Sequence, residues 1–420
     1  MPIKKLEIDS AAKRYLLLAA GVVSIVAAGI VAAWSLGNTF AVAAPDIEVA
    51  ETAVALAPAD PQSHFASAVL HERTFESADA VTAVREYEKA ASLSPNNYLI
   101  WLALAKIREA SGDRDGGQSA LARARDLAPN YARVRWAYGN VLLRQGEPEA
   151  AFEEMRAAAS ADQLFAQPLV VAAQQFYDGD ADAVRKAAGD SPAVLAALSL
   201  SLTNDKRFDE ALEIWQKIDG DQRSLFADTG KTILSKTIEA GKYNAALSLA
   251  NLLGDAPKYV VGAVYDGGFE NGVTMQNAGP FDWRIADGQQ PQVALTDGQR
   301  HSGAYSLLLI FRSNAGSDIR PIAQTIAVVP GAAYRFESFY RSDVKTAAKI
   351  HWQVTAADGR PLASTVPLAP SAEFNALSCD FTVPADVDGI NITLVRDACP
   401  GPCPIAGNLW LDDISMRERQ

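Results

Sequence analysis

A fixed spacing between two proline-containing turns is the strongest constraint on the fold of this 420-residue chain. The turns Ser94-Pro95-Asn96 and Ala128-Pro129-Asn130 are 34 residues apart, and the residues between them are rich in alanine and leucine. Large and small residues recur in matching places, namely Trp101, Leu104, Ala105, Leu121 and Ala124 in one copy and Gly139, Gly146, Ala151, Met155 and Ala158 in the next. This period predicts helical units that stack on their neighbours, because one unit alone cannot bury its apolar face.

The matching residues resemble the tetratricopeptide repeat, which has the same period. The resemblance implies an α-helical solenoid of about five or six units over residues 45–257. Pro58 and Pro95 are 37 residues apart, so we expect an enlarged turn around residues 72–79. Weaker copies of the turn and second helix occur at residues 207–212 and 241–247. Such arrays commonly bind a peptide or a protein on their concave face, which implies an envelope protein as partner; alternatively, the repeats are only a spacer.

Residues 15–36 form an apolar run of 22 residues without a charged side chain. As a helix that rises about 1.5 Å per residue, this run is long enough to cross a hydrocarbon core of about 30 Å. Four basic residues lie within residues 1–14, and the next basic residue is Arg73. The positive-inside rule therefore predicts a single-pass protein of the bacterial inner membrane, with a cytoplasmic N-terminus and its bulk in the periplasm.

A cleaved signal peptide is the alternative to a membrane anchor. The small residues Ala41-Val42-Ala43-Ala44 fit the pattern that a signal peptidase uses. However, the apolar run exceeds the roughly 7–15 residues typical of a signal-peptide core, which favours the anchor. A soluble product that begins near Ala44 would instead indicate cleavage.

After Pro257 the helical periodicity ends, and glycine and proline punctuate residues 260–420. Short β-branched and aromatic runs follow one another at intervals typical of strands. Candidate strands cover residues 304–311, 321–328, 333–340, 349–355, 376–383, 389–395 and 408–416. This pattern predicts an antiparallel β-sandwich of two sheets, so that the chain is multidomain, with an α domain and a β domain.

Four strings in the β segment make this prediction more specific. They are Asp266-Gly267-Gly268-Phe269-Glu270, Trp283, His301-Ser302-Gly303-Ala304-Tyr305-Ser306-Leu307 and Leu409-Trp410-Leu411-Asp412-Asp413-Ile414. In this order they resemble the galactose-binding-like jelly roll of carbohydrate-binding modules. The resemblance implies a jelly-roll sandwich and a polysaccharide ligand, although many members of that family bind no sugar.

The same resemblance implies a structural calcium ion. In that family the ion lies where the first strand, a small-residue turn and the last strand meet, and Glu270, Asp412 and Asp413 match those places. Carboxylate oxygens suit calcium, and backbone carbonyls can complete its shell. Alternatively, Asp412 and Asp413 are strand-end carboxylates that accept hydrogen bonds from backbone N–H groups. We expect no other cofactor.

Sugar binding requires aromatic faces with polar groups beside them. Trp352, Tyr340 and Trp283 are the candidates for stacking on a saccharide. The alternative for each of them is a position in the core of the sandwich.

Two cysteines flank a turn-forming spacer near the C-terminus. Cys399 and Cys403 enclose Pro400-Gly401-Pro402, which can bring the two sulfurs within bonding range, so we expect a disulfide outside the cytoplasm. Cys379 is expected to be a buried, small apolar residue.

Charge and motifs restrict the function. The net charge is −12 and no basic stripe occurs outside the N-terminus, which argues against nucleic-acid binding. No GxSxG, Walker or HExxH motif occurs, so we expect a non-enzymatic scaffold. The two resemblances taken together imply a role in surface polysaccharide assembly or export. Its repeats would bind an envelope protein and its sandwich a glycan or protein. The alternatives are a purely structural assembly factor and a glycan-cleaving enzyme that uses Glu270 and Asp412 as paired carboxylates.

Overall fold

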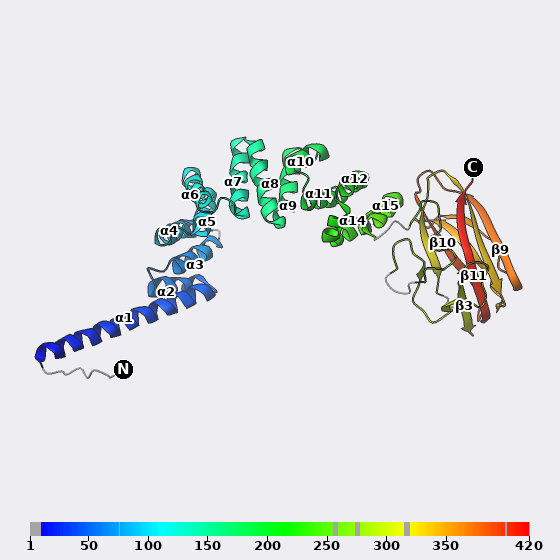
Figure 1. Ribbon diagram of the computed structural model, residues 1–420, viewed down its shortest axis with the longest axis horizontal. Coiled ribbons are helices and arrows are strands. Elements are labelled where there is room, and N and C mark those ends of the chain that lie inside the picture. The colour runs from blue at the N-terminus through cyan, green and yellow to red at the C-terminus, as the bar shows by residue number, and fades with distance from the viewer. Residues whose placement is uncertain are drawn as a thin grey trace, which may run out of the picture. The chain divides into compact units, whose positions relative to one another are not determined.

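The computed structural model describes residues 10–74, 76–254, 259–273, 278–314, 320–399 and 401–419. The chain divides into two compact units, Met1–Gly189 and Asp190–Gln420, whose helices and strands are labelled in Figure 1. The predicted boundary at Pro257 lies outside the described residues, as does most of the predicted cytoplasmic segment 1–14. The observed division falls earlier, so the helices after Gly189 belong to the same compact unit as the sandwich.

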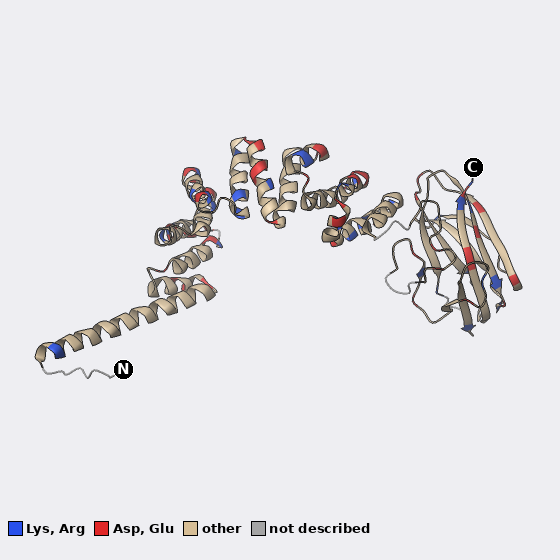
Figure 2. Cartoon of the chain, in the orientation of Figure 1, with Lys and Arg blue, Asp and Glu red and all other residues tan. Residues whose placement is uncertain are grey.

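Helix α1 (Ala11–Ala43) is longer than the predicted membrane segment 15–36. It begins after Ser10, whose side chain caps the helix by accepting a hydrogen bond from the backbone N–H of Lys13. Figure 2 shows no charged residue along the helix beyond its first turns. Within the described residues, α1 is the one helix that is long and apolar enough to cross a membrane.

The C-terminal end of α1 packs against the next helices of the first unit. Gly37 and Ala41 are buried, and α2 (Ile47–Leu56) lies against them. A β-carbon added at Gly37 would lie 2.6 Å from the β-carbon of Ala57 and 3.0 Å from the carbonyl oxygen of Ala53. Helix α1 therefore contains, without a break, both the apolar segment and the surface that packs against α2.

The remaining helices of the first unit form hairpins. They are α3 (Pro61–Glu72) with α4 (Ser77–Leu93), α5 (Tyr98–Ala110) with α6 (Arg114–Leu127), α7 (Ala132–Gln145) with α8 (Pro148–Ala161), and α9 (Ala166–Phe176) with α10 (Ala181–Ala188). Helices α5 and α7 begin 34 residues apart, as the proline spacing predicts. The longer spacing before Pro95 appears chiefly as extra helix, because α4 has 17 residues and α6 has 14.

Small residues lie where the paired helices approach most closely. A β-carbon added at Gly139 in α7 would lie 2.8 Å from Met155 Cγ and 2.9 Å from the carbonyl oxygen of Ala151, both in α8. Ala124 in α6 is fully buried, whereas Ala122 in the same helix is exposed. The two alanines therefore form a matched pair with opposite environments.

We predict that Ala124→Leu lowers the free energy of unfolding by roughly 1–3 kcal/mol, because added methylenes overpack a close helix interface. Ala122→Leu is the control and should change it by less than about 0.5 kcal/mol, since its side chain points to solvent. Denaturant unfolding of the full-length protein in detergent measures both. Equal effects of the two variants would contradict the proposed helix register.

The second unit begins with further hairpins. Its helices are α11 (Pro192–Asn204), α12 (Phe208–Gln216), α13 (Gly220–Arg223), α14 (Ala227–Glu239) and α15 (Tyr243–Leu253), with a short 3-10 turn, η2 (Ser224–Phe226), before α14. Helix α11 packs on α12 and α14 packs on α15. The two weak sequence copies at 207–212 and 241–247 coincide with the starts of α12 and α15. The described residues thus contain six hairpins, within the predicted number.

The C-terminal part is an antiparallel β-sandwich, as predicted. Its strands are β1 (Arg284–Ile285), β2 (Gln292–Thr296), β3 (Ser306–Ser313), β4 (Ile322–Ala327), β5 (Ala333–Ser342), β6 (Lys345–Thr346), β7 (Ile350–Ala356), β8 (Pro361–Ser364), β9 (Ser371–Thr382), β10 (Gly389–Arg396) and β11 (Ile405–Glu418). The first sheet has the order β1-β4-β10-β7-β8, and the second has β2-β3-β11-β5-β9, with β6 beside β11. Apolar side chains from both sheets form one core.

Helix α15 is fastened to the sandwich within the second unit. Asn244 donates a hydrogen bond from Nδ2 to the carbonyl oxygen of Val328 at 3.0 Å, and its backbone N–H donates to Asp388 at 3.3 Å. The ring of Tyr243 fills the space beside Gly389 so closely that a β-carbon there would collide with it. The last hairpin and the sandwich therefore share an interface, which the predicted domain boundary did not include.

Candidate functional sites

The structure brings Glu270, Asp412 and Asp413 together around a glycine turn. A β-carbon added at Gly268 would lie 3.6 Å from Glu270 Cγ, 3.8 Å from Asp413 Oδ1 and 3.9 Å from Asp412 Oδ1. Glu270 follows that turn, and the two aspartates lie in β11, beside an irregularity in its pairing with β5. The sequence prediction that these distant segments meet is therefore realised in the fold.

Asp412 is fully buried and its oxygens accept three backbone hydrogen bonds. Its Oδ2 accepts from the N–H groups of His301 at 2.6 Å and Ser302 at 3.1 Å, and its Oδ1 accepts from Asp413 N at 2.8 Å. Burial raises the pKa of the Asp412 carboxyl, while these hydrogen bonds act to lower it. The folded state therefore holds this proton more tightly than the unfolded state. As the pH rises from the pKa of the unfolded state through that of the folded state, the contribution of this carboxyl to the stability of the fold decreases.

The neighbouring carboxylates fix the loop that contains residues 301–305. Glu270 Oε1 accepts from the N–H groups of Ala304 at 2.9 Å and Tyr305 at 3.2 Å. Asp413, in a left-handed conformation with φ of 41°, interacts through Oδ2 with His301 Nδ1 at 2.6 Å and accepts from Ser302 Oγ at 2.7 Å. The carboxylates thus connect β11 to this loop.

The calcium site stays a prediction. The hydrogen bonds of Asp412 are those of the alternative, in which backbone N–H groups satisfy the carboxylate, whereas the partners of Asp413 are the side chains of His301 and Ser302. Within the described ranges, no group of three or more His, Cys, Asp or Glu side chains is arranged to hold a metal ion. The donors that surround Asp412 are N–H groups, which stabilise an anion and do not coordinate a cation.

We predict that Asp412→Ala lowers the melting temperature of the full-length protein, because three backbone N–H groups lose their acceptor at a cost of about 1–3 kcal/mol. Asp297→Ala removes an exposed carboxylate near the same loop and should have little effect. Chelator distinguishes the two roles of Asp412. If calcium is bound, chelator should lower the melting temperature of the wild type but not of Asp412→Ala; an unchanged wild type would contradict the calcium prediction.

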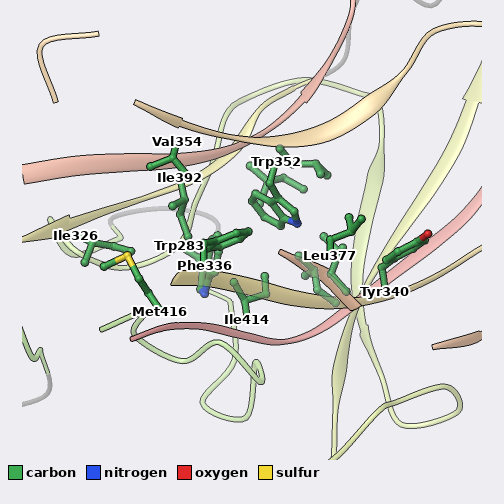
Figure 3. Packing of buried hydrophobic residues seen from close by; sticks show 14 of the residues in the cluster. Trp283, Ile326, Phe336, Tyr340, Trp352, Val354, Leu377, Ile392, Ile414 and Met416 are labelled. Atoms are coloured by element: carbon green, nitrogen blue, oxygen red, sulfur yellow. The ribbon is translucent and has the colours of Figure 1, made fainter. Parts of the chain in front are cut away.

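The three aromatic candidates for sugar stacking lie in the core, and this prediction is wrong. Trp352 is 0% exposed, Trp283 is 3% exposed and Tyr340 is 5% exposed. Figure 3 shows their rings among other core side chains, and the rings of Trp283 and Trp352 have centroids 6.0 Å apart. None of them can offer a ring face to a saccharide, because the two sheets cover them.

A different tryptophan lies on the outer face of the second sheet. Trp410 is half-buried and stands between the buried residues Leu409 and Leu411 in β11. The guanidinium of Arg341, its partner in β5, lies 5.5 Å from the centre of the Trp410 ring. Together with Asp343 and other residues they line a pocket of about 460 Å³. Strand alternation would have found Trp410, since an aromatic residue between two core residues faces outward.

The first unit carries a larger groove of about 760 Å³. It is lined mainly by α5 and α7, the first helices of two successive hairpins. Trp136 and Phe165 form part of its apolar surface, with ring centroids 5.4 Å apart. Lys106 and Arg133 are exposed basic residues of its lining, and within the described residues neither has an ion-pair partner.

Cys399 and Cys403 form a disulfide, with α-carbons 5.9 Å apart, so the predicted pairing is confirmed. Cys379 remains a free thiol that is partly buried beside the core, close to the predicted environment. Burial raises the pKa of this thiol to about 11, so it stays protonated and unreactive at neutral pH.

No protein-family model matches the chain, and no curated protein matches it either. The solved structure of a CBM4 module is 16% identical and covers 37% of this chain and 99% of that chain, with a TM-score of 0.29. A CBM22-1 xylan-binding domain from Paenibacillus barcinonensis is 13% identical and covers 38% of this chain and 96% of that chain, with a TM-score of 0.27. YrrB, a TPR protein with an unusual peptide-binding site, is 14% identical and covers 49% of this chain and 91% of that chain, with a TM-score of 0.27.

By its own helix spacing and sheet topology, the chain is a tetratricopeptide-type helical-repeat protein with a C-terminal β-sandwich, behind one apolar N-terminal helix. The helical part is similar to a TPR protein and the sandwich to carbohydrate-binding modules. Identities and TM-scores this low carry no function from those proteins to this chain.

Proposed function

We propose that this protein is a non-enzymatic, membrane-anchored scaffold whose repeats bind an extended peptide segment of another envelope protein. The groove between α5 and α7 carries this proposal, because it is a concavity of about 760 Å³ that successive hairpins build together. Helical-repeat arrays present such grooves to peptide ligands.

The chemistry of the groove favours an acidic peptide with apolar side chains. Leu99, Trp136 and Phe165 offer aliphatic and aromatic surface to apolar side chains. Lys106 and Arg133 face the same groove, one from each of the two helices, and attract carboxylates. The chain as a whole has a net charge of −12, so these two basic residues are a local departure from its overall charge.

Acidic peptides selected from a random display library on the full-length protein test this proposal. The double variant Lys106→Glu with Arg133→Glu should weaken their binding at least about tenfold, because two attractive contacts become repulsive. The double variant Lys89→Glu with Arg114→Glu, on α4 and α6 outside the groove lining, is the control of equal charge change and should leave binding unchanged. Fluorescence anisotropy measures the affinities, and equal weakening by both variants would show that only net charge matters.

The packing of α1 favours a retained anchor over a cleaved signal peptide. Ala41 to Ala43 are helical, and Ala41 is buried. Asn38 in α1 also donates a hydrogen bond to Asp60 at 3.1 Å. Cleavage near Ala44 would remove these contacts and expose Ala53 on α2 to solvent. With four basic residues before the apolar run, the anchor would leave both units in the periplasm.

We predict that the mature protein keeps α1 and stays in the membrane fraction after a high-salt wash. Intact-mass measurement checks this, and a reporter that is active only outside the cytoplasm, fused after the last residue, should be active. A chain that begins at Pro45 behind a foreign cleavable signal is the comparison, and it should unfold at lower temperature because α2 loses its partner. A wild-type product that begins near Ala44 would establish the signal peptide instead.

The sandwich is the second binding module in this proposal, with polysaccharide as its ligand. The half-exposed Trp410 on the outer face of the second sheet supports this role. A protein-binding module and a glycan-binding module on one anchor suit surface polysaccharide assembly or export. A purely structural assembly factor remains the alternative, in which the sandwich binds protein. Paired-carboxylate catalysis by Glu270 and Asp412 has the least support, because Asp412 is sealed from solvent.

A further inference from the structure

We propose that the pocket beside Trp410 binds the uronic-acid residues of an acidic polysaccharide. This inference rests on the proposed glycan-binding role of the sandwich and gives that role a location and a ligand class. The location differs from the three aromatic positions predicted from the sequence, all of which lie in the core. The evidence is the placement of one indole ring and two cations around the same pocket.

The indole supplies the surface on which a sugar ring can stack. Trp410 lines the pocket from β11, the central strand of the second sheet, and its ring is half-buried. Its cross-strand neighbours are Leu308 in β3 and Arg341 in β5. A half-buried indole on a sheet face offers a rigid apolar surface to the C–H groups of a pyranose.

Two cations supply the charge that a uronate requires. Arg341 lies over the Trp410 ring and donates a hydrogen bond to Gln299, so its guanidinium is held in place before any ligand binds. Lys345 in β6 is exposed, and within the described residues no hydrogen bond or ion pair occupies it. A planar guanidinium can bind a carboxylate through two parallel hydrogen bonds, which a neutral sugar cannot accept as strongly.

The acidic residue of the pocket, Asp343, offsets only one of the two positive charges. Asp343 Oδ1 accepts from the backbone N–H of Asn408 at 2.5 Å, and its Oδ2 accepts from Asn408 Nδ2 at 3.3 Å. The carboxylate is therefore engaged with an amide on β11 and forms no ion pair with Arg341 or Lys345 within the described residues. The pocket combines apolar ring surface with positive charge, which matches an acidic sugar better than a neutral one.

The position of the pocket also favours a saccharide over a peptide strand. Peptides that bind β-sheets commonly pair with a free sheet edge through their backbone. Trp410 and Arg341 instead lie on β11 and β5, which are interior strands of the second sheet. Their side chains project from the face of the sheet. A peptide strand needs unpaired backbone N–H and C=O groups, and these occur at a sheet edge.

Affinity electrophoresis of the full-length protein in detergent tests the inference, with polygalacturonate as the acidic probe and dextran as the neutral one. The wild type should bind polygalacturonate, with an affinity that falls as salt is added. Lys345→Gln should weaken this binding about tenfold, which corresponds to the loss of one charge-assisted contact. Trp410→Ala should weaken it at least as much, because the stacking face is removed.

Controls separate this site from a general loss of structure or charge. Lys349→Gln removes another exposed lysine of the sandwich, and Tyr305→Ala removes an exposed aromatic ring; both should bind like the wild type. Thermal unfolding of each variant shows whether the sandwich remains folded, and Lys345→Gln provides the test if Trp410→Ala does not fold.

The outcomes distinguish the failure of this site from the failure of the wider proposal. Binding of polygalacturonate that none of the variants weakens would overturn the Trp410 pocket while leaving glycan binding intact. Binding of dextran alone would overturn the acidic ligand. If the wild type binds neither probe but binds acidic peptides in a Lys345-dependent way, the sandwich is a protein-binding module, and both proposals for it fail.

Discussion

The β-carbon that Gly139 lacks would lie 2.8 Å from Met155, and the one that Gly37 lacks would lie 2.6 Å from Ala57. At both places the neighbouring segment approaches so closely that only the hydrogen of a glycine fits without a shift. This close approach is what each hairpin of the first unit depends on, and it explains why alanine recurs at one register in successive repeats. The same contact fixes α1 to α2, so an apolar segment becomes structurally continuous with a folded unit.

The repeat period and the strand pattern were predictable because they are local properties of the sequence. The spacing between Pro95 and Pro129 reappears in the starts of α5 and α7, and all seven predicted strands are present. The strands β1, β2, β6 and β8 were missed. They have two to five residues each, and runs this short show too few alternations to be distinguished from loops.

The aromatic site residues were mispredicted because they were chosen by residue type and not by the face of the strand. Trp352 stands between the polar residues His351 and Gln353, so strand alternation places its ring in the core. Trp410 stands between Leu409 and Leu411, and the same rule places its ring outside. If strand alternation had been applied to both strands, Trp410 would have replaced Trp352 as the candidate for stacking on a sugar.

The partners of the carboxylates were only partly predictable, because the sequence offered backbone N–H groups as an alternative to calcium but did not identify the loop that supplies them. Glu270, Asp412 and Asp413 were correctly predicted to meet, since strings typical of one fold mark the places where its segments converge. The hydrogen-bond partners of Asp412 come from the loop around His301 and Ser302, which is more than a hundred residues away in the sequence. The path of this loop therefore decides which groups surround the carboxylate. That path is set by tertiary packing, and a short polar loop carries no periodic signal for it.

The two proposed ligands are both anionic, although the protein itself has a net charge of −12. This combination is physically consistent, because at about 0.1 M salt exposed charges more than about 10 Å apart are largely screened from one another. A bound carboxylate is then governed by the cations next to it, Lys106 and Arg133 in the groove or Arg341 and Lys345 in the pocket. The negative remainder of the surface acts mainly on approach, where it disfavours anions that do not reach a basic site. Selectivity for acidic ligands at two small basic sites therefore requires no positive surface elsewhere on the chain.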